Sequence, residues 1–297
     1  MILVTGGSGF IGSHLVDKLI ERGFDVRVFD KMKPLREDVV WFQGDLMKDE
    51  DLLLACKDVE AIFHLAAVAD VNLAVSYPET CLDVNENYTV KLLKAAVANE
   101  VERILLASTT WVYGQANEKV DESSPIPMPD HVYTKSKIGQ EHLVYSWYKS
   151  YGLRYTILRY GIPYGPGMRS NMAIATFVRK AMRREPMMVF GNGNQGRCFI
   201  YVGDLAEGNV AALKESGKNE IFNLAGNEFV TINQVVDNLR QIFGEIDVRH
   251  DNSRSNDFKG VVVNIEKAKR LLGWEPKTSL KIGLKKYVEY VGQCAKA

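Results

Sequence analysis

The sequence predicts an α/β protein in which a doubly wound parallel sheet is followed by a smaller, mixed α/β domain. Short apolar runs alternate with amphipathic stretches through the first half of the 297-residue chain. Such alternation predicts parallel strands covered by helices on both faces, because right-handed crossovers place the helices there. After about Tyr160 the alternation weakens and loops rich in glycine and proline appear. We therefore predict one domain over residues 1–165 and a second over 166–297, with a segment near 197–225 returning to the first.

Buried strands and amphipathic helices follow one another in a regular order. Apolar runs predict strands at Ile2–Val4, Asp25–Phe29, Val39–Gln43, Glu60–Leu65, Arg103–Ala107 and Tyr155–Leu158. The stretches between them predict helices at His14–Arg22, Leu52–Cys56, Tyr88–Ala98 and Lys135–Lys149. In the second half we expect short strands at Val189–Phe190, Phe199–Val202 and Ile221–Leu224, and a helix that a capping box at Thr231–Gln234 opens.

Composition excludes several classes of protein. The 37 Lys and Arg residues balance 37 Asp and Glu residues, and zero net charge argues against a general binder of nucleic acid or anionic membranes. No apolar run approaches the ~18–20 residues that span a bilayer, and the N-terminus shows no signal peptide. The four cysteines have neither a pairing rhythm nor CxxC spacing, so no disulfide framework or metal site is indicated. We expect a cytoplasmic protein.

A glycine-rich segment, Thr5–Gly12, follows the first predicted strand and opens the first helix. Gly6 allows a tight turn, Gly9 lets the backbone approach a pyrophosphate, and Gly12 lets the helix pack closely against the strand. The helix N-terminus presents free N–H groups to the phosphates. Asp30 ends the second strand, where a carboxylate binds the adenosine ribose and repels a 2′-phosphate. The segment predicts a Rossmann-type site for NAD, although the neighbouring Lys31 and Lys33 weaken the preference over NADP.

Tyr133 and Lys137 lie four residues apart, so a helix places a phenol and an ammonium on one face. A phenol becomes a useful base at neutral pH when its pKa falls by about three units, or about 4 kcal/mol. A cation about 4 Å away supplies about 4 kcal/mol at an effective dielectric of about 20. We therefore expect Lys137 to lower the pKa of Tyr133, which then accepts a proton. Tyr145 and Lys149 share this spacing but lie further along the helix, and we predict a surface pair there.

Three hydroxyl residues, Ser108, Thr109 and Thr110, follow the strand that begins at Arg103. Ligands bind outside the carboxyl ends of the strands in open parallel sheets. We favour Thr110 as the group that hydrogen-bonds a substrate beside Tyr133. Ser108 and Thr109 remain alternatives, as does a purely structural role for all three, since such hydroxyls often satisfy the backbone at a strand end.

Together these motifs resemble the extended short-chain dehydrogenase/reductase family, in its branch of NAD-dependent sugar-nucleotide epimerases and dehydratases. The resemblance covers nearly the whole chain; its further motifs are Asp45-Leu46, His64–Ala67, Ser108–Gly114, Arg159–Gly167, Gly191–Val202, Asp204–Ala206, Asn223–Gly226 and Leu272–Pro276. It implies that Tyr133 and Lys137 also contact the cofactor, together with Phe10, Ile11, Asp45, Leu46, Leu65, Ala66, Ala67 and Pro163. It implies substrate contacts from Thr110, Tyr133, Asn171, Arg197 and Arg254, and a structural role for His64 and Trp274.

Departures from the family pattern favour one reaction. Dehydratases of the family carry Asp-Glu directly after the catalytic Thr, where Trp111-Val112 follows Thr110, and decarboxylases carry Glu at the position of Trp111. A 4-epimerase needs only the Thr, Tyr and Lys set with NAD. The resemblance therefore implies an epimerase that inverts C4 of a nucleotide sugar through a transient 4-keto intermediate, most closely of the UDP-glucose/UDP-galactose type. Ile162 stands where the family has an Asn that contacts phosphate, and Asn171 is our candidate to replace it.

Two other functions remain open. One is an NAD(P)-dependent reductase or dehydrogenase that acts on a keto-sugar nucleotide or another small carbonyl compound. The other is a non-catalytic protein that senses its cofactor. The resemblance also implies a homodimer built on the helices at Tyr88–Ala98 and Lys135–Lys149, where Val144, Trp147 and Tyr148 belong either to the interface or to the core.

Overall fold

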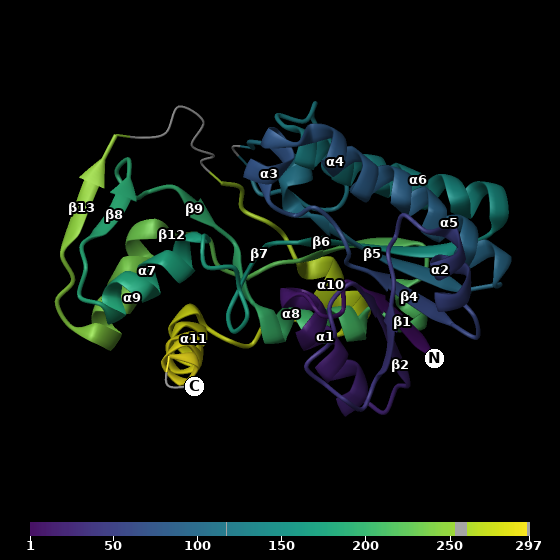
Figure 1. Ribbon diagram of the computed structural model, residues 1–297. Coiled ribbons are helices and arrows are strands. Elements are labelled where there is room, and N and C mark those ends of the chain that lie inside the picture. Colours follow the sequence, from purple (N-terminus) through teal and green to yellow (C-terminus); the bar gives the residue numbers. More distant parts are fainter. Residues whose placement is uncertain (117, 253–259, 296–297) are drawn as a thin grey trace.

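A parallel sheet forms the larger lobe of the computed structural model, which describes residues 1–116, 118–252 and 260–295 (Figure 1). Within these ranges the sheet has seven strands in the order β11-β6-β5-β4-β1-β2-β3. The strands are β1 (Ile2–Thr5), β2 (Val26–Asp30), β3 (Val40–Gln43), β4 (Ala61–His64), β5 (Arg103–Thr109), β6 (Arg154–Tyr160) and β11 (Glu220–Leu224). The strand order reverses at β1, which confirms the predicted doubly wound α/β class.

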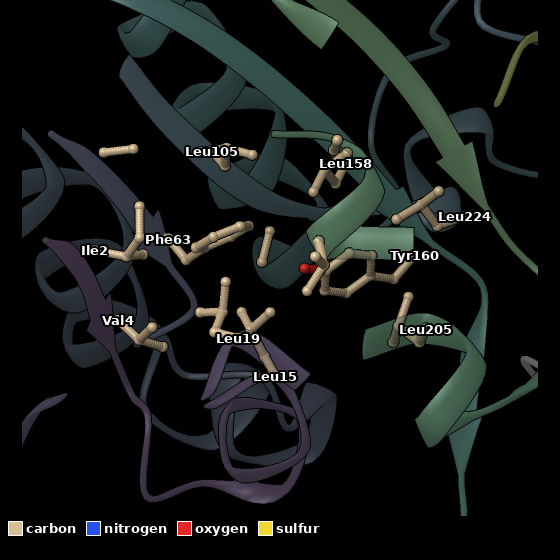
Figure 2. Packing of buried hydrophobic residues seen from close by; sticks show 14 of the residues in the cluster. Ile2, Val4, Leu15, Leu19, Phe63, Leu105, Leu158, Tyr160, Leu205 and Leu224 are labelled. Carbon is tan, nitrogen blue, oxygen red and sulfur yellow. The ribbon is translucent and has the colours of Figure 1, made fainter. Parts of the chain in front are cut away.

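Helices cover both faces of this sheet, since the strands are apolar on both sides. On one face lie α1 (Phe10–Glu21), α8 (Val202–Ala211) and α10 (Glu266–Leu272); on the other lie α2 (Asp49–Ala55), α5 (Tyr88–Ala98) and α6 (Val132–Tyr151). Successive residues of β5 serve opposite faces: Leu105 packs with α1 and α8, whereas Leu106 packs with α5 and α6. Figure 2 shows Leu15 and Leu19 of α1 directed toward Phe63 of β4 in the first of these two cores.

The second half of the chain builds a smaller lobe beside the carboxyl edge of the sheet (Figure 1). Its core holds Tyr164, Phe177, Val189, Leu239 and Leu284. The elements here are β7 (Ile162–Tyr164), α7 (Ala173–Met182), β8 (Met187–Phe190), β9 (Gly196–Arg197), β10 (Phe199–Tyr201), β12 (Val230–Thr231), α9 (Ile232–Phe243), β13 (Val248–Asp251) and α11 (Leu280–Cys294). The 3₁₀ turn η3 (Glu215–Gly217) instead lies beside β11 and α10 of the larger lobe. The predicted capping box opens α9: Gln234 donates its backbone N–H to the Thr231 hydroxyl, and its side chain accepts from the Thr231 N–H.

Two strands run further toward the smaller lobe than the apolar pattern indicates. β5 and β6 continue to Thr109 and Tyr160, with Ser108 paired to Arg159 and Thr109 paired to Tyr160. The predicted strands end where polar residues begin, but Ser108 and Arg159 are buried and both donate to the Glu141 carboxylate on α6, so the ladder continues. The connections at this edge are α3 (Val71–Ser76), α4 (Pro78–Leu82), the π-helical turn η1 (Asp83–Asn87) and the 3₁₀ turn η2 (Thr110–Tyr113).

In the C-terminal half of α6, some side chains are exposed and others pack against the core. Lys149 places its ammonium 6.0 Å from the centre of the exposed Tyr145 ring, so these two residues form the predicted surface pair. Val144 is fully buried in the core of this lobe, and Trp147 and Tyr148 are half-buried and pack against the same core. Within the described ranges, no helix combines the length and the apolar character needed to cross a membrane.

Candidate active site

The glycine turn between β1 and α1 has no room for side chains. A Cβ atom on Gly12 would lie 2.1 Å from the Gly6 carbonyl oxygen, and one on Gly6 would lie 2.8 Å from the Ala66 backbone nitrogen. Gly6 has a φ of +72°, which glycine adopts without strain. The exposed Gly9 is the N-cap of α1 and provides no side-chain cap, so the backbone N–H groups of Phe10 and Ile11 face outward at the positive end of the helix. This cradle fits the pyrophosphate of a dinucleotide.

The carboxylate of Asp30 is fixed beside that turn. Its two oxygens accept backbone N–H groups from Ser8 and Met32, each at 3.0 Å. Lys31, which was expected to weaken a preference for NAD, instead places its ammonium 2.9 Å from a carboxylate oxygen of Asp45. Asp45 therefore balances the Lys31 charge, and this arrangement fits the preference for NAD that the sequence predicts.

The other cofactor candidates line the same edge of the sheet. Leu46 is buried, and the residues from Leu65 to Ala67 are half-buried where the chain leaves β4. Pro163 is half-buried in β7, opposite Ile200 of β10. These segments come from both halves of the chain and meet at the carboxyl ends of the strands, where the turn and Asp30 also lie.

Thr109, rather than Thr110, lies beside the Tyr133 hydroxyl. The Thr109 side chain lies next to the half-buried Tyr133 phenol and acts to lower its pKa, and α6 presents this phenol in its first turn. Thr109 is the last residue of β5, whereas Thr110 begins the 3₁₀ turn η2. Ser108 instead donates to the Glu141 carboxylate at 2.5 Å. The choice of Thr110 is thus corrected by one residue, because the strand is longer than its apolar run.

Lys137 is buried one turn after Tyr133. Its ammonium donates to the Ala107 carbonyl oxygen at 2.9 Å and to the Gln140 side-chain oxygen at 2.8 Å. Burial lowers the pKa of Lys137 to about 8. Burial also raises the pKa of Tyr133 to about 12, against the opposing effects of Thr109 and of the Arg169 charge. The expectation that Lys137 lowers the pKa of Tyr133 is therefore wrong for the protein alone, because removal from water costs the phenolate more than nearby charges return.

Asn171 and Arg169 are held at the site through Asp70. The Asp70 carboxylate caps α3 and accepts hydrogen bonds from Asn171 Nδ2 at 3.1 Å and Arg169 Nη1 at 3.0 Å. This places a partly exposed guanidinium near Tyr133, which the sequence analysis did not single out. No motif of the sequence marks it; only the ion pair with a residue 99 positions earlier reveals it.

The remaining substrate candidates are Arg197 and Arg254. Arg197 belongs to β9 and donates from Nη1 to the Gly196 carbonyl oxygen at 2.7 Å. Arg254 lies outside the described residues. Aromatic rings border the site on another side: His131 stacks on Tyr133 with ring centres 6.1 Å apart and contacts the Trp111 ring edge-on at 5.3 Å. His131 also caps α6, by accepting the Thr134 backbone N–H.

Comparison with known proteins agrees with this geometry. The model of a family described as the NAD-dependent epimerase/dehydratase family matches residues 2–225. The chain belongs to this family. It is therefore an enzyme of the family's type, with NAD as its cofactor, and the glycine cradle and Asp30 fit that cofactor.

Solved structures and relatives that cover nearly the whole chain include more than one activity. The UDP-glucose 4-epimerase of Thermotoga maritima, solved with UDP-glucose, is 33% identical over 99% of both chains with a TM-score of 0.92. The UDP-glucuronic acid 4-epimerase of Bacillus cereus, solved with UDP-glucuronic acid and NAD, is 30% identical over 99% of both chains with a TM-score of 0.92. The UDP-glucuronic acid decarboxylase 1 of Xenopus tropicalis is 32% identical over 97% of this chain and 71% of its own. Overall identity therefore leaves the reaction to be argued from the site.

The close contacts of Gly12 lead to a prediction about NAD binding. Gly12→Ala should weaken NAD binding by about tenfold or more, because overpacking of about 1–3 kcal/mol pushes α1 and its N–H groups away from the turn. Titration calorimetry of NAD into cofactor-free protein measures this. Gly292→Ala in α11 is the control, since its Cβ would have only the Met182 methyl group at 3.9 Å as a neighbour and should leave the affinity unchanged. Equal affinities of the two variants would contradict the proposed role of the cradle.

Proposed function

We propose that this protein is an NAD-dependent 4-epimerase of a UDP-hexose, which interconverts UDP-glucose and UDP-galactose through a 4-keto intermediate. The observation that carries the proposal is the half-buried phenol of Tyr133 with the buried Thr109 and Lys137 near the NAD cradle. The whole-chain similarity to proteins named as UDP-sugar 4-epimerases supports it.

Each residue of the set has a distinct role in this chemistry. When bound, NAD supplies the acceptor and donor of hydride at its nicotinamide. Tyr133 takes the proton of the C4 hydroxyl and returns it after the 4-keto sugar has rotated to present its other face. Thr109, whose side chain neighbours the Tyr133 phenol, orients the C4 oxygen. Lys137 holds a positive charge below the phenol, and this charge favours the phenolate once water is excluded.

The residues that follow Thr109 argue against the other reactions of the family. With Thr109 in place of Thr110, the next two residues are Thr110 and Trp111, and neither is a carboxylate. By the resemblance described above, dehydratases carry Asp-Glu there and decarboxylases carry Glu. The one-residue correction therefore leaves the argument for an epimerase unchanged.

The test uses purified protein with UDP-glucose and no added cofactor, and chromatography follows the nucleotide sugars. We expect UDP-galactose to form, together with NAD and nucleotide sugar released from the denatured protein and identified by mass spectrometry. UDP-glucuronate is assayed in parallel, and turnover of it alone would replace the proposed substrate. A requirement for one equivalent of reduced cofactor per product would instead favour the reductase.

The two threonines provide a matched pair of variants. Thr109→Val should lower kcat by about 10²-fold, because it removes a hydrogen-bond donor aimed at the reacting oxygen while the side-chain shape is kept. Thr110→Val should leave kcat near its wild-type value. Steady-state kinetics with UDP-glucose distinguish the two, and a larger loss in Thr110→Val would restore Thr110 as the residue beside the substrate.

A homodimer and a cytoplasmic location also remain proposals. Because Val144 is fully buried, an interface on α5 and α6 has to use other residues of these helices, and the half-buried Trp147 and Tyr148 are candidates.

A further inference from the structure

A buried polar side chain, Gln140, lies between the Lys137 ammonium and the interior of the larger lobe. Its side chain is fully buried on α6, and its oxygen accepts from Lys137 Nζ at 2.8 Å. Its amide nitrogen donates to the Thr89 hydroxyl on α5, also at 2.8 Å. Nothing in the proposed proton transfer needs a glutamine here, and an apolar residue would avoid the cost of burying an amide.

The hydrogen bonds around Thr89 can be assigned by counting protons. A hydroxyl carries one proton, and the Thr89 hydroxyl donates it to the Asn85 carbonyl oxygen at 2.6 Å. The Thr89 oxygen must therefore accept the hydrogen bonds from its other neighbours. His64 Nε2 lies 2.9 Å from the Thr89 oxygen, so this ring nitrogen carries the proton.

The same count extends to the glycine turn. With its proton on Nε2, His64 accepts at Nδ1 from the Thr5 hydroxyl at 2.8 Å, and the Thr5 oxygen accepts the Ala66 N–H at 3.3 Å. Burial lowers the pKa of His64 to about 3, so the ring stays neutral and its tautomer constant. A continuous chain of hydrogen bonds thus joins the NAD cradle to Gln140.

This chain determines which way Gln140 points. If the amide were turned over, its NH₂ group would face the Lys137 ammonium, donor against donor, and its oxygen would face a Thr89 hydroxyl that has no proton left to give. The observed orientation gives the Lys137 ammonium an acceptor at 2.8 Å and the Thr89 oxygen a donor at 2.8 Å, whereas the approach of the Gln140 nitrogen to His64 Nε2 is longer, at 3.5 Å. In a buried site an unsatisfied polar group costs more than the bond itself is worth.

We infer that Gln140 is a positioning residue that holds Lys137 in its charged form beneath Tyr133, and that Thr5, His64 and Thr89 keep its oxygen turned toward the ammonium. The inference rests on the proposed function. The ionisable groups that act on Lys137 are Cys81 on α4, His64 on β4 and Glu141 on α6, and Tyr133 lies one turn earlier on the same helix. His64 is neutral and Glu141 is paired with Arg159, so the Gln140 oxygen is the acceptor that directly contacts the ammonium from a side chain.

The test is the pH profile of kcat/KM for epimerisation. Gln140→Met keeps the side-chain volume but removes the acceptor of the Lys137 ammonium. The pKa of Lys137, and with it the alkaline limb of the profile, should therefore move to lower pH by about one unit, the size expected for a hydrogen bond to a charged group. Gln140→Glu adds a negative charge, and its limb should move to higher pH. The control is Asn209→Leu, which removes another fully buried polar group on α8, bonded to Tyr160 and Leu205, and should lower the melting temperature without moving the limb.

Several outcomes would overturn the inference. The inference is wrong if Gln140→Met folds and keeps the alkaline limb of the wild type. It is also wrong if the limbs of Gln140→Met and Gln140→Glu shift in the same direction. If neither variant folds, ¹⁵N NMR of His64 in the wild-type protein decides, because a proton on Nδ1 breaks the chain. Inactive Tyr133→Phe together with an unshifted Gln140→Met would remove this inference alone, whereas active Tyr133→Phe would remove the proposed function itself.

Discussion

Tyr133→Phe should lower the turnover of the epimerase by about 10³-fold, while the purified protein keeps its NAD. The phenol hydroxyl is the group that takes the C4 proton, and a positioned acid–base group contributes about 10²–10⁴-fold. Loss of the hydroxyl leaves the ring and its stacking on His131 in place, so the site should keep its shape. Single-turnover kinetics with UDP-glucose measure the effect, and the absorbance of released NAD shows that the cofactor is retained.

Tyr145→Phe is the matched control for this variant. Tyr145 belongs to the second Tyr-x-x-x-Lys segment of the same helix, but its ring is 49% exposed and carries the Lys149 ammonium at 6.0 Å. Its activity should equal that of the wild type. Near-normal epimerisation by Tyr133→Phe would remove the acid–base role of this tyrosine, and equal losses in both variants would point to a general effect on α6.

Glu141→Leu should lower the free energy of unfolding by about 3–5 kcal/mol, because it leaves a buried guanidinium without its partner. Glu141 and Arg159 form an ion pair of 2.7 Å, and their side chains are 5% and 3% exposed. The same carboxylate accepts from Ser108, and Arg159 also donates to the Tyr113 hydroxyl at 3.0 Å. This network joins α6 to the ends of β5 and β6, so activity should fall together with stability.

Urea unfolding of two further variants isolates the cause. The double variant Glu141→Leu/Arg159→Met should recover most of the lost stability, since both buried charges are then gone. Glu207→Leu breaks an exposed pair with Arg22 and should cost less than about 1 kcal/mol. A loss below about 1 kcal/mol in Glu141→Leu would show that Arg159 finds another partner or water, contrary to this account.

The part of the site that the sequence predicted best is the part that depends on local backbone geometry. Glycines at positions 6, 9 and 12 and an acidic residue at the end of the next strand are constraints that act within one βαβ unit. The structure reproduces them with a close approach of Gly12 to Gly6 and of Gly6 to Ala66. The spacing of Tyr133 and Lys137 within one helical turn is local in the same sense.

The predictions that failed concern features that depend on burial and on contacts between elements far apart in the chain. The strand that begins at Arg103 was ended at Ala107 because polar residues follow, yet Ser108 and Thr109 stay in the ladder, because Glu141 and Tyr133 of α6 satisfy their hydroxyls. That extension moved the hydroxyl beside Tyr133 from Thr110 to Thr109. The expected effect of Lys137 on the Tyr133 pKa failed because spacing along a helix says nothing about desolvation.

By itself, the sequence determined the α/β class, the turn that binds the dinucleotide and the helix that carries Tyr133 and Lys137, since periodicity and glycine placement encode short-range geometry. Only the tertiary structure decided which threonine meets the phenol, that Arg169 reaches the same site through Asp70, and that a hydrogen-bonded chain turns Gln140 toward Lys137. These contacts depend on which groups are buried together. The groups come from residues far apart in the chain, so the contacts exist only after the elements have packed.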